Sequence, residues 1–471
     1  MNNLKPYTKY KPSGIAWLGD IPEHWEERRI KYFFREIDNR SETGDEDLLS
    51  VSHYTGVTKK RDRLAENEMI SNAKTLVGYK IVEKGDLVIN IMLAWNGSLG
   101  ISKFNGITSP AYCVYRSLIG GEKYFGYLFR TKEAQQEFKK QSTGIIDSRL
   151  RLYTDKFFNI KTVIPTPEEQ TAIARFLDYK LAKINRFIQK KKQLIKLLNE
   201  QKAAIINQAV TKGLEANAKM KDAGIEWLGD IPEHWEVWRL KYLINGKLKY
   251  GANESGGDFV ENHPRYIRIT DFDKSGKLRD NTFCSLNPEL AEPYLLKEGD
   301  ILFARSGGTV GKTFQFKNYD GVACYAGYLI KAEPNTTKIT SDYLFAFTNS
   351  GIYDQWKSFI FNKATIENIG ADKYSLLPVI LPPLTEQQQI VYYIEKETAI
   401  INTTISKIEK ELALTEEYKT ALIAEAVTGK IDVRNYEIPT ITEPETYNEL
   451  EEELYIAAED ETEYQNEDVE E

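Results

Sequence analysis

One segment of this sequence resembles a catalytic motif in its residue types and spacing. Residues 306–313 read SGGTVGKT and end in Gly-Lys-Thr, like a loop that binds the phosphates of a nucleotide. Ser306, however, stands where that motif requires its first glycine, and the residues FQFKNYDGV that follow predict a strand and a turn. A phosphate-binding loop needs a helix N-terminus at that point. We therefore interpret the segment as a glycine loop that displays Arg305 and Lys312, and not as a nucleotide site.

Histidine and cysteine, the usual ligands of structural zinc, do not cluster in this chain. The sequence has four histidines and three cysteines. His24 and His234 lack Cys or His companions at ligand spacing, and Cys113, Cys284 and Cys324 are far apart with no CxxC pair. We expect no metal site and no disulfide framework, and we assign the histidines to packing and the cysteines to small buried side chains.

The sequence contains an internal repeat. Residues 14–25 read GIAWLGDIPEHW and residues 224–235 read GIEWLGDIPEHW, so the two copies differ only at Ala16 and Glu226. Downstream of each copy, residues 164–210 and 381–427 also align without a gap. Because the tryptophans recur unchanged beside unlike segments, we favour structural junctions over stacking platforms for bases.

The two downstream segments have the apolar spacing of long helices. Prolines at 165 and 167, and at 382 and 383, precede each helix, and Gly213 and Gly429 follow its last turn. Each helix then spans about 43 residues, or roughly 64 Å. The expected apolar seam consists of Ile173, Leu177, Ile184, Ile188, Ile195 and Ile205 in the first helix and Ile390, Ile394, Ile401, Ile405, Leu412 and Leu422 in the second.

Such a stripe needs a partner, and the second copy supplies one. We expect the helices to pair in antiparallel fashion as an intrachain coiled coil with pseudo-two-fold symmetry. Two alternatives stay open: each helix packs on its own globular domain, or the seam joins two chains.

The segments between these repeats predict mixed domains. Strand-like runs such as 86–93 and 300–306 alternate with turns rich in Gly, Asn and Asp. The fold class is therefore α+β, with two mixed α/β domains separated by two long helices. The expected boundaries are 1–163, 164–217, 218–380, 381–430 and a tail at 431–471.

The net charge of −8 conceals an uneven distribution. Residues 435–471 hold 15 acidic residues and no Lys or Arg, so residues 1–434 carry 62 basic and 55 acidic groups, a balance of +7. An acidic, apolar-poor tail is expected to be disordered. It either keeps the protein in solution or competes with DNA phosphates for the basic body. With no apolar stretch of about 20 residues and no apolar signal core at the start, we expect the cytoplasm.

Taken together, these features resemble the specificity (S) subunit of type I restriction-modification systems. The resemblance is carried by the two GIxWLGDIPEHW motifs, GDLVIN, GDILFARSGGTVGK and LPPLTEQQQI before a long helix, and it covers residues 14–430. It implies two target-recognition domains that each read half of an interrupted DNA sequence, with the helices fixing the gap.

The resemblance also implies partners and cofactors. Two methyltransferase (modification) subunits would dock beside the helices and carry S-adenosylmethionine, and restriction/translocase subunits would bring ATP and Mg. This chain itself is expected to be non-catalytic and without a cofactor. Adenine methylation by enzymes of this kind needs Asn or Asp before Pro-Pro and an aromatic residue after it, whereas Leu381 and Leu384 flank the Pro-Pro pair here. The main alternative is a coiled-coil adaptor whose inserted domains bind proteins.

Candidate DNA-reading residues follow from side chains that contact bases and phosphates. In the first domain they are Lys59, Lys60, Arg61, Arg63, Asn96, Ser98, Ser148, Arg149 and Arg151. In the second they are Lys249, Tyr250, Asn253, Arg265, Arg268, Thr270, Arg305, Thr309, Lys312, Asn362 and Lys363. For each residue alone, an ordinary solvated surface position is the competing interpretation.

Overall fold

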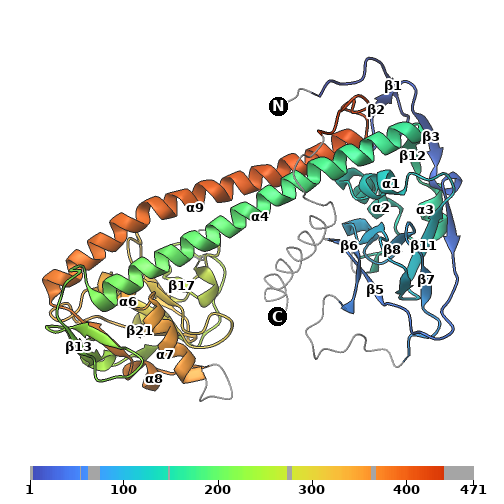
Figure 1. Ribbon diagram of the computed structural model, residues 1–471. Helices are drawn as coiled ribbons and strands as arrows, with labels where there is room; N and C mark the ends of the chain where they lie inside the picture. Colours follow the sequence, from blue (N-terminus) through green and yellow to red (C-terminus); the bar gives the residue numbers. More distant parts are fainter. Residues whose placement is uncertain are drawn as a thin grey trace. The chain divides into compact units, whose positions relative to one another are not determined.

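The computed structural model describes residues 4–53, 55–61, 75–146, 149–272, 278–279, 281–361 and 368–439. Figure 1 shows the chain, which divides into two units. Unit 1 comprises residues 1–192 and 410–471, and unit 2 comprises residues 193–409. Each unit contains one mixed domain and a part of each long helix.

The long helices are α4 (Pro167–Lys212, 46 residues) and α9 (Leu384–Val427, 44 residues). Acidic residues occupy both first turns, where they complement the helix dipole. Gly213 and Gly429 follow the last turns with φ of 73° and 75°, the left-handed conformation that closes a helix. These ends agree with the start and stop signals of the sequence.

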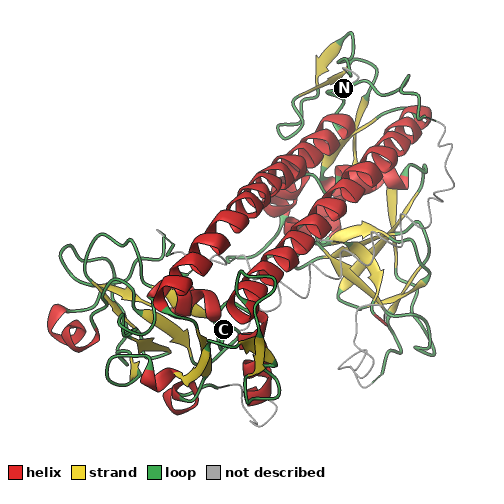
Figure 2. Ribbon diagram, turned by 60° about the vertical axis from the view of Figure 1, so that its left-hand side comes forward, coloured by secondary structure: helices red, strands yellow, loops and turns green. Residues whose placement is uncertain are grey.

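Within each unit the two helices run antiparallel. In unit 1, Ile173 and Leu177 near the start of α4 share a core with Leu422 and Val427 at the end of α9. In unit 2, Ile206 and Val210 of α4 share a core with Ile390 and Ile394 of α9. Figures 1 and 2 show the helices side by side in both views. The expected antiparallel helix pair is thus confirmed.

The expected seam residues all lie at least partly out of solvent. Ile173, Leu177, Ile188, Ile390, Ile394, Ile401 and Leu422 are buried, and Ile184, Ile195, Ile205, Ile405 and Leu412 are half-buried. Ile206, the neighbour of Ile205, is buried, because the end of α4 packs into the core of unit 2 as well as onto α9. Ile408, which the seam prediction omitted, is also buried.

Unit 1 is built on a four-stranded antiparallel sheet with the order β4-β11-β8-β9. These strands are β4 (Phe34–Ile37), β11 (Tyr112–Ser117), β8 (Leu87–Asn90) and β9 (Leu99–Ile101). Two-stranded ribbons surround the sheet: β1 (Tyr10–Pro12) with β2 (Asp20–Pro22), β3 (Glu26–Arg29) with β12 (Lys161–Ile164), β5 (Leu49–Ser52) with β6 (Gly56–Lys59), and β7 (Lys80–Val82) with β10 (Gly106–Thr108). The helices are α1 (Glu122–Leu128), α2 (Lys132–Gln141), α3 (Thr154–Asn159) and the 3-10 turns η1 (Ile30–Tyr32) and η3 (Ala94–Asn96).

Unit 2 repeats this plan with the sheet order β16-β21-β18-β19. These strands are β16 (Lys249–Tyr250), β21 (Leu329–Ala332), β18 (Ile301–Ala304) and β19 (Thr313–Gln315). The ribbons are β13 (Met220–Asp222) with β14 (Asp230–Pro232), β15 (Glu236–Arg239) with β22 (Pro378–Leu381), and a parallel pair, β17 (Arg265–Ile267) with β20 (Ala323–Tyr325). The helices are α5 (Pro288–Ala291), α6 (Ser341–Phe347), α7 (Gly351–Phe361), α8 (Ala371–Ser375) and the 3-10 turns η5 (Leu240–Tyr242), η6 (Ile269–Asp271) and η7 (Glu292–Tyr294).

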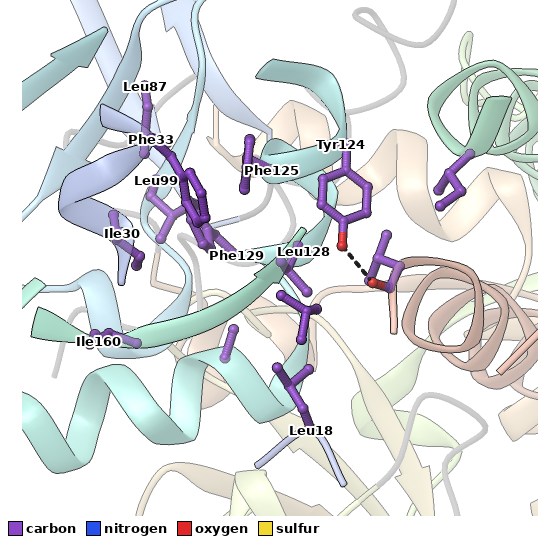
Figure 3. Packing of buried hydrophobic residues seen from close by; sticks show 14 of the residues in the cluster. Leu18, Ile30, Phe33, Leu87, Leu99, Tyr124, Phe125, Leu128, Phe129 and Ile160 are labelled. Carbon is purple, nitrogen blue, oxygen red and sulfur yellow. Dashed lines mark hydrogen bonds between the residues drawn. The ribbon is translucent and has the colours of Figure 1, made fainter. Parts of the chain in front are cut away.

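The core of unit 1 is largely aromatic. The Phe125 ring stacks on Phe33 and lies tilted against Phe129, with ring centres 5.6 Å apart in both pairs. Figure 3 shows these side chains in the core. The dashed line in Figure 3 marks the bond that the Tyr124 hydroxyl donates to the Val427 carbonyl, 2.9 Å long. This core therefore includes the end of α9, and the sheet, its helices and the long helix form one body.

The start of the expected disordered tail is ordered. Ile431 and Val433 are buried in the core of unit 1, and the amide of Asp432 donates to the Lys5 carbonyl. These two apolar side chains explain why the fold of unit 1 continues beyond residue 431. The acidic residues after Pro439 lie outside the described residues.

Candidate nucleic-acid interface

The repeated tryptophan motif lies where one long helix begins and the other ends. In unit 1, Trp25 is fully buried, and a side chain at Gly429, just after α9, would approach its ring to 3.0 Å. In unit 2, Trp235 is fully buried, and a side chain at Gly213, just after α4, would approach its ring to 3.1 Å. These tryptophans are packing residues, so stacking of bases on them is excluded in this conformation.

In each unit, the histidine of the repeated motif contacts the first turn of the long helix that begins there. His24 lies 2.9 Å from Glu169 in the first turn of α4, and His234 lies 2.8 Å from Glu386 in the first turn of α9. A lysine completes each junction, because Lys430 donates to the Asp20 carbonyl and Lys212 to the Asp230 carbonyl. Both copies of the motif thus join a domain to two helix ends, and they place each domain on the helix pair.

In unit 2, several candidate residues meet where the sheet strands end. Arg305 directly follows β18; its guanidinium lies 5.1 Å from the centre of the Tyr250 ring, and its amide donates to the Tyr328 carbonyl. Asn253 lies beside Gly327 in the neighbouring turn. We call Tyr250, Asn253, Arg305, Lys312 and Tyr328 the strand-end surface.

Most of the strand-end surface faces solvent. Tyr250 is 43% exposed and Tyr328 is 63% exposed, while Asn253 and Lys312 are exposed and Arg305 is half-buried. A cation beside aromatic rings offers charge to phosphates and flat faces or donors to bases. Sequence reasoning missed Tyr328, because a single tyrosine in a turn carries no pattern of its own.

The loop that resembled a nucleotide site belongs to the same edge. Residues 306–312 connect β18 to β19, and β19 is a strand, as the sequence predicted. Gly307 and Gly308 have open space around them, so this loop presents backbone and the side chain of Lys312. A strand in this position offers no helix N-terminus to a phosphate.

Unit 1 has the equivalent loop between β8 and β9. Leu152 donates its amide to the Ile91 carbonyl after β8, just as Ile369 donates to the Arg305 carbonyl after β18. Asn96 lies in this loop, and Arg151 pairs through its backbone with Thr143. Leu152 and Ile369 therefore hold corresponding positions in the two units. Arg149 is exposed, and Asn96 and Arg151 are half-buried.

The remaining candidates of unit 1 lie away from this loop or are buried. Lys59 ends β6 and forms a 2.8 Å ion pair with Asp47, whose pKa is lowered by this hydrogen bond. The Lys59 ammonium lies over the ring of Phe104, which follows β9. Asn96 lies before the start of that strand, so the two residues are associated with opposite ends of β9. Lys60 is half-buried and Arg61 is exposed. Ser98 is buried and donates to Asn96, so its hydroxyl does not face solvent.

The arginines near β17 are held by the protein itself. Arg265 is buried, donates to the Arg279 carbonyl and lies between Phe283 and Tyr319. Arg268 pairs with Asp271, and this hydrogen bond raises the pKa of the Arg268 guanidinium. Thr270 is exposed and Thr309 is half-buried. Arg265 is consequently a structural residue in this conformation.

Four candidates, Arg63, Ser148, Asn362 and Lys363, lie outside the described residues. Among the residues that the structure describes, no group of three or more His, Cys, Asp or Glu is arranged to hold a metal ion. No helix in that part of the chain is long and apolar enough to cross a membrane.

Comparison with known proteins gives a consistent result. The family model described as type I restriction modification DNA specificity domain matches residues 22–197 and again 232–413. The chain is 27% identical over 444 residues to the type I restriction enzyme MjaVIII specificity subunit of Methanocaldococcus jannaschii, covering 88% of this chain and 95% of the relative. It is 23% identical over 360 residues to the EcoDI specificity subunit of Escherichia coli, covering 72% and 78%.

A solved structure agrees with the fold. One chain in a study of complex assembly and conformational transition of the type I R-M system matches with a TM-score of 0.61 at 15% identity, over 87% of this chain and 99% of that chain. Because the family model matches both units and most of the chain, this protein belongs to the family of type I restriction modification DNA specificity domains, with two copies of the domain, and recognises DNA sequence.

Proposed function

We propose that each unit reads one half of an interrupted DNA target and that the helix pair sets the gap between the halves. The observation that carries this proposal is the contrast between the two units. Their junctions and sheet orders match, whereas the surfaces at the corresponding loops differ: WNGSLG at 95–100 against SGGTVGK at 306–312. A repeated frame with unlike surfaces suits two unlike half-sites.

The strand-end surface is our candidate for base reading in unit 2. In unit 1 we assign the same role to Asn96, Arg149 and Arg151, with Lys59, Lys60 and Arg61 as candidate phosphate contacts. Phosphate contacts hold register and base contacts select sequence, so the two classes predict different mutant behaviour.

The chain acts without catalysis of its own, and the helix pair is the docking surface for two methyltransferase subunits. Large apolar side chains on the helices support this role. Tyr392 and Ile400 of α9 are 69% and 75% exposed in unit 2, and Leu414 of α9 is 65% exposed in unit 1. Solvated apolar side chains along a helix are typical of a protein contact. S-adenosylmethionine would bind these partners, and ATP and Mg the restriction/translocase subunits, in the cytoplasm.

The test is selection of bound sequences from a random double-stranded DNA library with the full chain. The wild type should enrich two unlike half-sites at one fixed spacing. Arg305→Ala should relax one half-site and leave the other intact, while Arg149→Ala should do the reverse if it reads bases. Lys221→Ala, an exposed lysine on β13, is the matched control and should change neither.

The alternatives give different results. Uniform weakening by Arg305→Ala at all sequences would make Arg305 a phosphate contact. Binding that is independent of salt would speak for an adaptor instead of a DNA reader, because neutralised phosphates release counterions. Family membership favours DNA, and no observation on the described residues favours the adaptor.

A further inference from the structure

One face of α4 in unit 1 carries positive charge that the described residues do not neutralise. Arg175, Lys183 and Lys190 are exposed and Lys180 is half-buried, and none of the four forms an ion pair with a described carboxylate. We call these four residues the α4 basic strip. From residue 171 to 199 the only acidic residue of α4 is Asp178, which is already bound by Lys123 at 2.7 Å and by the Tyr127 hydroxyl at 2.6 Å.

The residues that directly precede the acidic segment pack on α4 beside this strip. Tyr436 packs on α4, with its ring centre 4.9 Å from that of Phe176 and 6.3 Å from that of Tyr179. The Lys180 ammonium lies 5.1 Å from the centre of the Tyr436 ring, and the Lys183 ammonium 4.7 Å from that of Tyr179. Arg434, whose guanidinium is bound by Asp432, is the last basic residue of the sequence.

The residues that follow have the matching charge. Residues 437–471 hold 15 acidic residues and no Lys or Arg. Thirty-five residues reach at most about 120 Å when extended, whereas the strip from Arg175 to Lys190 is roughly 23 Å long, so length does not prevent contact. A segment anchored at one end of a surface is present at a high effective concentration, which favours even weak contacts.

We propose that the acidic segment 437–471 docks on the α4 basic strip of the same chain and that polyanions compete with it there. This contact is electrostatic and reversible. It makes the segment an internal competitor for phosphates or for an acidic partner surface near α4. The proposal concerns unit 1 alone, and it holds whether or not the assignment of half-sites to the two units is right.

The direct test is lysine acetylation of the full chain, read residue by residue by mass spectrometry at low salt. The comparison chain has the acidic residues from Glu443 onward replaced by Gln or Asn. Lys183 and Lys190 should react about threefold faster in that chain, and the difference should vanish near 0.5 M salt, where charges are screened within a few ångströms. Lys84, Lys132 and Lys156, exposed elsewhere in unit 1, should react equally in both chains.

A second variant removes the anchor of the acidic segment. Tyr436→Ala keeps all the charges, so the acetylation rates of Lys183 and Lys190 should be intermediate between those in the other two chains. Equal acetylation of Lys183 and Lys190 in all three chains would overturn the proposal. So would protection that persists at 0.5 M salt, because the contact would then not be electrostatic.

DNA competition is measured separately. Replacement of the acidic residues should raise the affinity of the full chain for a duplex of arbitrary sequence, with a steeper dependence on salt. If the acetylation result holds and this affinity does not change, the docking is real but DNA is not the competitor. If the chain binds no DNA, the acetylation result still stands by itself.

Discussion

The two units have the same junction but satisfy its buried groups differently. In unit 1, Glu169 is almost fully buried and accepts the Tyr7 hydroxyl at 2.5 Å as well as contacting His24. Among the residues that the structure describes, the Trp25 indole nitrogen has no hydrogen-bond partner. In unit 2, Glu386 is more exposed and takes the Trp235 indole N–H at 2.9 Å beside His234. The junction therefore requires a carboxylate at the helix start, while its other partner is interchangeable.

The same contrast recurs in the sheets. Asp86 accepts two bonds from Arg116 in unit 1, at 2.8 and 3.0 Å, and Asp300 pairs with Lys331 in unit 2 at 3.3 Å. Each carboxylate directly precedes an inner strand of its sheet, β8 or β18, and follows a left-handed glycine, Gly85 or Gly299. Both units have an ion pair at this position, with arginine in one and lysine in the other. The two domains therefore share a structural plan that their sequences hardly show.

The largest expected effect concerns the junction tryptophans. Trp25→Ala or Trp235→Ala each deletes a fully buried ring and should destabilise its own unit by about 3–5 kcal/mol. Hydrogen exchange resolved by unit measures this loss. Trp238→Ala, at a partly exposed position, is the control and should cost less. If either deletion left its unit as stable as the wild type, the common role of the motif would be refuted.

Asp86→Asn should cost unit 1 about 2–4 kcal/mol, because it leaves part of a buried charge pair unpaired. Asp300→Asn should cost unit 2 less. Burial raises the pKa of Asp300, so the charged form is disfavoured in the folded state. The stability that protonated Asp300 contributes to unit 2 is full below the unfolded-state pKa of about 4, and it is lost as pH rises through the folded-state pKa. Unit 2 stability should therefore fall less steeply with pH in Asp300→Asn, and an unchanged pH slope would contradict this.

At the helix starts, Glu169→Gln should destabilise unit 1 by about 1–3 kcal/mol, since the buried Tyr7 hydroxyl and the more exposed His24 lose a charged acceptor. Glu386→Gln should have a smaller effect on unit 2, because that side chain is more exposed. The two variants are compared by unit-resolved hydrogen exchange at the same pH. Equal losses would show that burial does not distinguish the two carboxylates.

The smallest effect concerns the segment after α9, at Asp432. Its hydrogen bond with Arg434 lowers the pKa of Asp432, so this contribution is present above the unfolded value of about 4 and is lost as pH falls through the folded value. Asp432→Asn should cost unit 1 less than about 1 kcal/mol, and this cost should disappear as pH falls through the folded-state pKa of Asp432. Acid titration of both chains by circular dichroism checks it. A loss that persists at acid pH would indicate a packing role for Asp432.

The sequence predicted best those features that depend on neighbouring residues or on repeated segments. The duplicated motif, the helix ends and the apolar spacing at residues such as Ile173 and Ile390 follow from periodicity and terminating residues, and the helix pair was predicted from them. The common sheet order was not, because short strands such as β4 and β16 are defined by partners distant in sequence.

The candidate site was harder to predict for the same reason. Charged and polar side chains in loops were identified by type, but type alone does not separate exposed Lys312 from buried Arg265. Tyr328 joined the site only through a backbone contact with Arg305. The sequence gives no sign of such a contact between turns.

We infer that one chain reads two unlike half-sites across a gap set by the helices. The most direct measurement repeats the DNA library selection with a full chain in which seven residues, one heptad, are inserted into α4 and into α9 at facing positions. A heptad preserves the seam and lengthens each helix by about 10 Å. We predict the same two half-sites with a wider gap. An unchanged gap, or loss of either half-site in a folded chain, would contradict the claim.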